Sequence, residues 1–257
     1  MSAPFGVQII FYLFLAGVAA GSALVASMML HRADPTAFTT GKRSLVLSII
    51  AIGLGVILLI ADLANPAEFF LILSEANTQS AIAWGARIVT AFTLIAIFVW
   101  TLYRNKTTGS ATVGECAALW LLRLLALSLA IYPGFVLWQG KAIALWNTWL
   151  IVPLIALSGL HAGFAASSLL SGNGKVLPSH QGLLEKVFLV ALGLLVIALL
   201  VMTKSTSMLA IIALITSVVV PVVLLKRGAA VVTSLSILVG SFCLRAWLIS
   251  DGQSLFF

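Results

Sequence analysis

Charged residues are scarce in this chain. Lys, Arg, Asp and Glu make up only 8% of its 257 residues, whereas 62% are hydrophobic. A soluble domain usually carries about a quarter of its residues as charges, because its surface must face water. The scarcity of charge excludes an ordinary soluble domain and predicts a protein that lies within a lipid bilayer.

Cysteine and histidine are also rare. The two cysteines, Cys116 and Cys243, do not have the spacing of an iron–sulfur cluster or of a zinc site. Haem b held by two histidines needs both of them within the membrane, and only His161 lies in an apolar run. We therefore expect no metal, no haem and no iron–sulfur cluster in this chain.

Long apolar runs account for most of the sequence. A helix needs about 20 apolar residues to cross a hydrocarbon core of roughly 30 Å. Transmembrane β-strands would instead show short runs of alternating polarity. We therefore predict an all-α, polytopic membrane protein with eight transmembrane helices. The predicted spans are 7–30, 44–64, 81–103, 116–138, 145–170, 184–202, 208–225 and 229–249.

Two of these spans share a pattern of small residues. The first contains Gly17 and Gly21 and the fifth contains Gly159 and Gly163, each pair among Ala and Ser. Small residues at this spacing let helices approach closely. The match predicts a single membrane domain, 1–257, built from two four-helix bundles at about 1–138 and 139–257. The alternative is that Gly and Ala are simply common in membrane helices.

The distribution of basic residues predicts the orientation. With eight spans both termini lie on one side, where the loops hold only Lys141 and Lys204. Loops retained in the cytoplasm are rich in Lys and Arg, so both termini are predicted to be periplasmic. The net charge of +7 follows from this topology, and nothing in the sequence indicates nucleic-acid binding. The opposite side carries Arg32, Lys42, Arg43, Arg104, Lys106, Lys175, Lys186, Lys226 and Arg227.

Polar and ionisable side chains within the spans are the functional candidates, because they are costly in a membrane. Six helices are predicted to place such groups near the outer surface. These residues are Gln8, Tyr12, Asp62, Arg87, Tyr132, Trp146, Asn147 and Arg245. A smaller inner group consists of Arg123, His161 and Lys186.

Each candidate also has a simpler interpretation. Asp62 and Arg87 could form a structural ion pair, and the aromatic residues could belong to the interfacial belt. Arg245 could extend to the outer headgroups, and His161 could be a buried core residue. The outer group as a whole is the stronger signal, because an aromatic belt has no need for Asp, Arg, Gln and Asn together.

The order of several short motifs resembles the NrfD/PsrC-like family, the membrane subunits of polysulfide reductase-type complexes. The motifs are FYLFLAG followed by AG in the first span, DLANPAEF after the second, SAIAWGA into the third, YPG on the fourth and LWN into the fifth. The resemblance extends over most of the chain. The length, the eight spans and the lack of haem agree with it.

This resemblance implies a quinone-reactive anchor of a respiratory molybdopterin oxidoreductase in the bacterial inner membrane. The implied cofactor is menaquinone or ubiquinone. The implied partners are a ferredoxin-like iron–sulfur subunit and a molybdopterin catalytic subunit, both periplasmic, and a dimer of such complexes is a further expectation. The protein would exchange electrons with quinone and would not act on the terminal substrate itself.

The resemblance also implies roles for the polar residues. Tyr132 matches the family's quinone-facing tyrosine, whereas Tyr12 and Gln8 stand where polysulfide reductase has histidine and asparagine. Trp146 and Asn147 complete the expected quinone contacts. Charge or proton exchange near the quinone is expected of Asp62, Glu68, Arg87 and Arg245. An inner proton path is expected to involve Arg123, His161 and Lys186.

A different class of function is a secondary transporter or proton channel. The internal repeat and the buried charges favour it. Transporter sites are typically marked by Gly- or Pro-interrupted spans at matching positions of the two halves. Pro221 has no obvious counterpart in the first half, so the quinone-reactive anchor is the preferred interpretation.

Overall fold

The computed structural model describes residues 6–62, 81–109, 111–141, 143, 145–171, 181–203, 207–225 and 230–254. Within these ranges every regular element is a helix and no strand occurs, which confirms the all-α prediction. The helices are α1 (Val7–Met29), α2 (Pro35–Asp62), α4 (Ala81–Tyr103), α5 (Val113–Gln139), α6 (Ile151–Leu170), α7 (Gln181–Thr203), α8 (Met208–Leu214), the π-helical turn η2 (Ile215–Val219), α9 (Val220–Leu225) and α10 (Ala230–Ser254).

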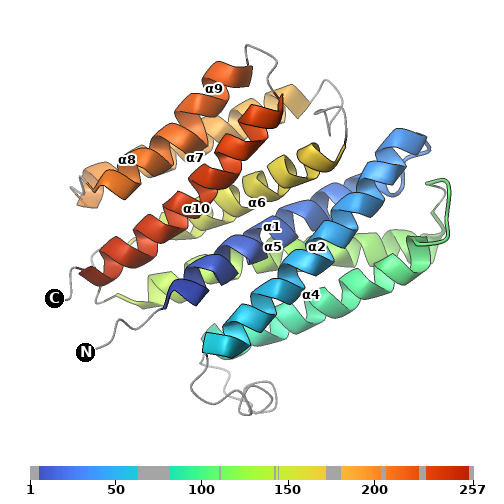
Figure 1. The fold of residues 1–257 in the computed structure, drawn as a ribbon. Coiled ribbons are helices and arrows are strands. Elements are labelled where there is room, and N and C mark those ends of the chain that lie inside the picture. The colour runs from blue at the N-terminus through green and yellow to red at the C-terminus, as the bar shows by residue number, and fades with distance from the viewer. Residues whose placement is uncertain are drawn as a thin grey trace.

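The helices form an elongated bundle (Figure 1). Helix α1 begins and α10 ends at the same end of this bundle, which we name the termini end. The opposite end, where α1 ends and α2 begins, is named the basic end after its Lys and Arg residues. Among the described residues, six helices are long and apolar enough to cross a membrane, namely α1, α2, α4, α5, α6 and α10. The protein is therefore a multi-pass membrane protein.

The last third of the sequence holds two shorter apolar helical stretches. The described side chains there form apolar helices at Leu189–Met202 and Met208–Leu224. They coincide with the sixth and seventh predicted spans. Because each is shorter than a candidate span, the count of eight spans stays a prediction. The second of them contains η2, which ends two residues before Pro221. Proline lacks an N–H donor and its ring crowds the carbonyl four residues earlier, which accounts for a widened turn at this place.

Helix boundaries depart from the predicted spans where polar residues act on the backbone. Helix α2 begins at Pro35 rather than at residue 44. The Asp34 carboxylate accepts hydrogen bonds from the Thr36 hydroxyl at 2.6 Å and from the Ala37 N–H at 3.0 Å, and so caps this helix. Helix α6 begins at Ile151 rather than at residue 145, because the residues before it form turns.

A very close helix contact joins α1 to α6. A Cβ on Gly17 would lie 2.8 Å from the Cα of Gly159, and a Cβ on Gly21 would lie 2.7 Å from the Cα of Gly163. Real side chains do not tolerate such distances, so only glycine fits these positions. The two similar motifs therefore pack against each other in register, which confirms that their small residues serve close helix contact. The division into two four-helix bundles stays a prediction.

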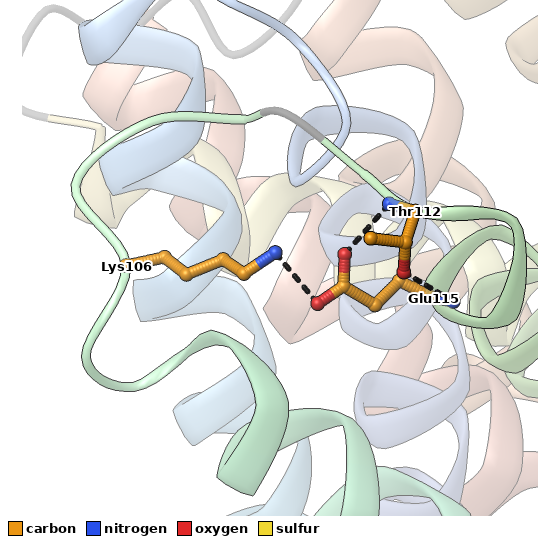
Figure 2. Close-up of polar contacts among 3 residues, drawn as sticks. All are labelled: Lys106, Thr112 and Glu115. Carbon is orange, nitrogen blue, oxygen red and sulfur yellow. Dashed lines mark hydrogen bonds and ion pairs between the residues drawn. The ribbon is translucent and has the colours of Figure 1, made fainter.

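The connection between α4 and α5 shows how the basic end is held (Figure 2). The Thr112 hydroxyl accepts from the Glu115 N–H, and the Glu115 carboxylate accepts from the Thr112 N–H at 2.8 Å, which together form a capping box. The Lys106 Nζ lies 2.6 Å from the same carboxylate. The Lys42 Nζ donates to the carbonyls of Arg104 and Lys106, so α2 is joined to this connection.

Candidate functional site

Two tyrosines meet between the helices near the termini end. The hydroxyl of Tyr12, early in α1, is hydrogen bonded to the hydroxyl of Tyr132, late in α5. The Tyr12 side chain is buried, with 5% of its surface exposed, whereas Tyr132 is half-buried. The structure thus brings together two residues predicted to lie across one pocket, although 120 positions separate them in the sequence. We name them the tyrosine pair.

Glycines on two other helices make room for the rings of this pair. A Cβ on Gly85 of α4 would lie 2.6 Å from the Tyr132 ring, and a Cβ on Gly55 of α2 would lie 3.3 Å from the Tyr12 ring. Each ring therefore packs directly on the backbone of a neighbouring helix. Four helices, α1, α2, α4 and α5, fix the positions of the two hydroxyls.

The other members of the predicted outer group lie on α1, on α4 and in the turns before α6, or fall outside the described side chains. Gln8 is exposed and lies one turn before Tyr12 on α1, so the two side chains share a face of that helix. Asn147 is exposed in the turns before α6. The guanidinium of Arg87 lies over the Trp84 ring, 5.4 Å from its centre. The side chains of Asp62 and Lys186, and all of Glu68, fall outside the described residues.

Trp146 is part of the packing between α5, α6 and α10. Its side chain is buried, and its indole N–H donates to the carbonyl of Leu248 at 2.8 Å. A Cβ on Gly252 would lie 2.4 Å from the indole nitrogen, and one on Gly140 would lie 2.6 Å from the ring. The indole N–H of Trp146 is thus bound within the protein, and its role as a quinone contact stays a prediction.

Arg245 is enclosed where α1, α6 and α10 meet. Only 1% of its surface is exposed, so the alternative that it extends to the headgroups is wrong. Its Nε donates to the Leu13 carbonyl at 3.0 Å, and Nη1 donates to the Ser158 and Ser241 hydroxyls at 3.0 and 2.6 Å. No carboxylate of the described residues pairs with it. Neutral oxygens from three helices therefore hold this buried cation.

The space for Arg245 comes from the glycines of the α1–α6 contact. A Cβ on Gly17 would lie 2.7 Å from its Nη2, and a Cβ on Gly159 would lie 3.0 Å from the same atom. Sequence reasoning placed Arg245 in the outer half of the last helix but missed these partners. The Ser-Gly pair at 158–159 is visible in the repeated motif, yet the sequence does not say which helix would face it.

The described residues of the predicted inner group lie on different helices. Arg123 of α5 donates from Nε to the Ser27 hydroxyl at 3.0 Å and from Nη2 to the Ser27 carbonyl at 2.7 Å. Its guanidinium also lies over the Trp120 ring. His161 is buried on α6, between the two glycines that contact α1. Arg123 thus ties α5 to α1, and His161 is the more deeply enclosed of the two.

The described residues contain no group of three His, Cys, Asp or Glu side chains that could hold a metal ion. The chemistry that they offer at the termini end is hydrogen bonding from hydroxyl and amide groups, beside a positive charge. Such groups suit a neutral ligand with carbonyl oxygens. The fold and this polar cluster together define a multi-pass helical membrane protein with a candidate ligand site between its helices.

Comparison with known proteins identifies the family. The family model of polysulphide reductase, NrfD, matches residues 1–209, so the chain belongs to the NrfD family. The protein is similar to the C subunit of polysulfide reductase from Wolinella succinogenes, with 27% identity over 175 residues. That alignment covers 62% of this sequence and 55% of the relative, so the chain spans about half the length of the curated relative it matches. The family predicted from the short motifs is confirmed.

Proposed function

We propose that this protein is the quinone-reactive membrane subunit of a respiratory molybdoenzyme complex in the bacterial inner membrane. It would exchange electrons between menaquinone or ubiquinone and a ferredoxin-like iron–sulfur subunit, which in turn serves a molybdopterin catalytic subunit. Membership of the NrfD family supports this class. The observation that carries the site is the tyrosine pair, where Tyr12 and Tyr132 join their hydroxyls near one end of the bundle.

The donor groups present fit a quinone carbonyl. Two hydroxyls carry two protons, and their mutual hydrogen bond uses one of them. The other proton is available for an external acceptor, and Tyr132 is the more exposed of the two residues. Gln8 adds amide donors one helical turn before Tyr12. Apolar walls of the same helices suit the isoprenoid tail.

A quinone supplies two-electron redox chemistry coupled to the uptake or release of two protons. In this proposal the Tyr132 hydroxyl donates to one quinone carbonyl, and the Tyr12 hydroxyl donates to the Tyr132 oxygen and holds its orientation. Asp62 and Glu68 exchange protons with the aqueous phase at the termini end. Arg87 contributes positive charge, and Arg245 holds α1 in register through the carbonyl of Leu13, next to Tyr12.

The test separates quinone chemistry from assembly. Quinol-dependent activity and activity with an artificial electron donor are measured on the same membranes for Tyr132→Phe, Tyr12→Phe and Gln8→Ala. Loss of one neutral hydrogen bond, about 0.5–1.5 kcal/mol, lowers quinol-dependent turnover roughly two- to tenfold and leaves the dye reaction unchanged. Tyr103→Phe is the matched control, because Tyr103 is the other tyrosine of the sequence and lies at the basic end. Normal quinol turnover in all three variants would contradict this placement.

The proposed orientation places both termini in the periplasm. It is supported by the excess of Lys and Arg in the loops of the basic end. Fusions of alkaline phosphatase and of a fluorescent protein to the C-terminus decide the matter. We expect phosphatase activity without fluorescence, and the reverse result would invert the topology.

The proposed proton path from the basic end passes His161, with Arg123 and Lys186 near its entrance. The burial of His161 within the α1–α6 contact supports this role. An ionisable side chain costs free energy in a membrane interior, so its presence there indicates a function. His161→Leu is expected to lower the number of protons moved per electron in reconstituted vesicles while quinol oxidation continues. An unchanged ratio would reduce His161 to a structural residue.

A further inference from the structure

A groove on the outside of the bundle lies at the basic end, away from the tyrosine pair. Its volume is about 350 Å³, and it is formed by α2, α4 and the end of α6. Its walls are apolar and include Val46, Leu47 and Ile50 of α2 and Trp100 of α4. Ile50 is 54% exposed, so the groove opens toward the space that lipid occupies around a membrane protein. We name it the α2 groove.

One end of the α2 groove carries two positive charges. Lys42 and Arg43 follow one another at the start of the apolar part of α2, on the stripe that continues through Val46. The Lys42 Nζ donates to the carbonyls of Arg104 at 2.7 Å and Lys106 at 3.2 Å. The Arg43 Nη1 donates to the Leu170 carbonyl at 2.9 Å. Both cations are therefore held in place at the mouth of the groove.

These carbonyl contacts orient the two cations without neutralising them. Carbonyl oxygens at a helix terminus carry only partial negative charge. No carboxylate among the described residues forms an ion pair with Lys42 or Arg43. Arg43 uses one of its five N–H donors in its contact with Leu170, which leaves the rest of its fork for a further acceptor. Two positive charges are thus fixed at one end of the apolar α2 groove.

We propose that the α2 groove binds one anionic phospholipid, with the phosphate at Lys42 and Arg43 and an acyl chain along Val46, Leu47 and Ile50. The depth agrees with this occupant, because the two cations lie where the predicted span begins and where phosphates meet the hydrocarbon. Basic pockets between transmembrane helices are a recurring form of anionic-lipid recognition. A ligand without a negative charge would leave both cations without a counter-charge.

The test is native mass spectrometry of the purified full-length protein in mild detergent. It is incubated with phosphatidylglycerol or with phosphatidylcholine of the same acyl chains. These lipids share the phosphate and differ in net charge, so selective retention of one phosphatidylglycerol per protein molecule is expected. Equal retention of both lipids would overturn the proposal, and so would displacement of phosphatidylglycerol by an equal amount of menaquinone.

Variants locate the bound lipid. Lys42→Gln with Arg43→Gln is expected to weaken phosphatidylglycerol binding about 30-fold, or about fivefold for each cation, which corresponds to about 1 kcal/mol each. The matched control, Arg32→Gln with Arg104→Gln, removes the same charge from the same end but leaves the groove intact. Retention of phosphatidylglycerol by the first pair, or its loss from the control pair, would contradict the site.

Single substitutions keep the proposal testable if the double variant does not fold. Val46→Trp fills the groove and is expected to prevent retention although both cations remain. Leu54→Trp is its control, because Leu54 is 50% exposed on the same helix outside the groove. Arg43→Lys keeps the charge and is expected to keep the preference for phosphatidylglycerol. Unchanged binding in Val46→Trp would show that the lipid binds elsewhere.

Discussion

The termini end and the basic end of this bundle hold their polar side chains in different ways. At the termini end Tyr12, Trp146 and Arg245 are enclosed between helices, and glycines provide the space that they occupy. At the basic end Lys42 and Arg43, about two turns into α2, donate to backbone carbonyls at the ends of α4 and α6. Enclosed groups depend on how closely helices pack, whereas Lys42 and Arg43 depend on exposed hydrogen bonds to neighbouring helices. Substitutions at the two ends should therefore differ in size and in kind.

The largest effect is expected at the α1–α6 contact, on which the termini end depends. A Cβ on Gly163 would lie 2.4 Å from the Cα of Gly21, so Gly163→Val forces two backbones apart. Overpacking usually costs about 1–3 kcal/mol of stability. Because the new side chain would meet backbone atoms, which cannot move aside, we expect a loss at the upper end of this range or above it. Gly53→Val is the control, because a Cβ there meets nothing within 4 Å. Thermal unfolding of the purified variants makes the comparison, and equal losses would show that helix propensity alone matters.

Arg245→Leu is expected to have the next largest effect. The Ser158 and Ser241 hydroxyls and the Leu13 carbonyl lose a charged donor, and a buried polar group left unsatisfied costs about 1–3 kcal/mol. Relief from burying the charge offsets part of this, so a net loss of roughly 2 kcal/mol in stability is expected. Arg104→Leu, at an exposed position, should change stability by less than about 0.5 kcal/mol. A stabilised Arg245→Leu would mean that the cation is retained for function alone.

Gly85→Ala tests whether the position of the Tyr132 ring matters for the tyrosine pair. The added methyl group would meet the Tyr132 ring at 2.6 Å and move its hydroxyl away from Tyr12. Quinol-dependent activity is expected to fall several-fold, as for loss of one hydrogen bond, while the dye reaction continues. Gly53→Ala serves as control in the same assay. If Gly85→Ala and Gly53→Ala behave alike, the position of Tyr132 does not govern turnover.

The smallest effect is expected at the basic end. Glu115→Gln keeps an acceptor for the Thr112 N–H and removes the ion pair with Lys106. Partly exposed ion pairs contribute about 0–1 kcal/mol, and salt screens them. Unfolding at low and high salt should therefore show a loss below about 1 kcal/mol that shrinks at high salt. A loss as large as that of Gly163→Val would abolish the contrast between the two ends.

Much of the fold could be predicted because each helix has its own signal in the sequence. The apolar runs located the helices, and the paired small residues indicated close packing before any partner was known. Boundaries were missed where a local hydrogen bond decides, as at Asp34, whose cap starts α2 earlier than the apolar run. The length of an apolar run does not show how many polar turns extend the helix beyond the hydrocarbon into the headgroups.

The candidate site could be predicted only in part. The sequence indicates the depth of a residue along its helix, but it does not tell which neighbouring helix the side chain contacts. Tyr12 and Tyr132 were placed at one depth, and they do meet. Trp146 and Arg245 were placed at a similar depth, yet contacts with α10 bind the indole N–H and neutral oxygens enclose the guanidinium. Those contacts join residues about a hundred or more positions apart, and only the packed structure brings them together.

Direct labelling of the quinone site is the sharpest test of the proposed function. A photoreactive quinone analogue is bound to the purified complex, irradiated, and mapped by peptide mass spectrometry with excess native quinone as competitor. Competed labelling is expected on the start of α1 and the end of α5, the segments of Tyr12 and Tyr132. Competed labelling confined to the basic end, at the α4 segment that holds Trp100 and Tyr103, would contradict it.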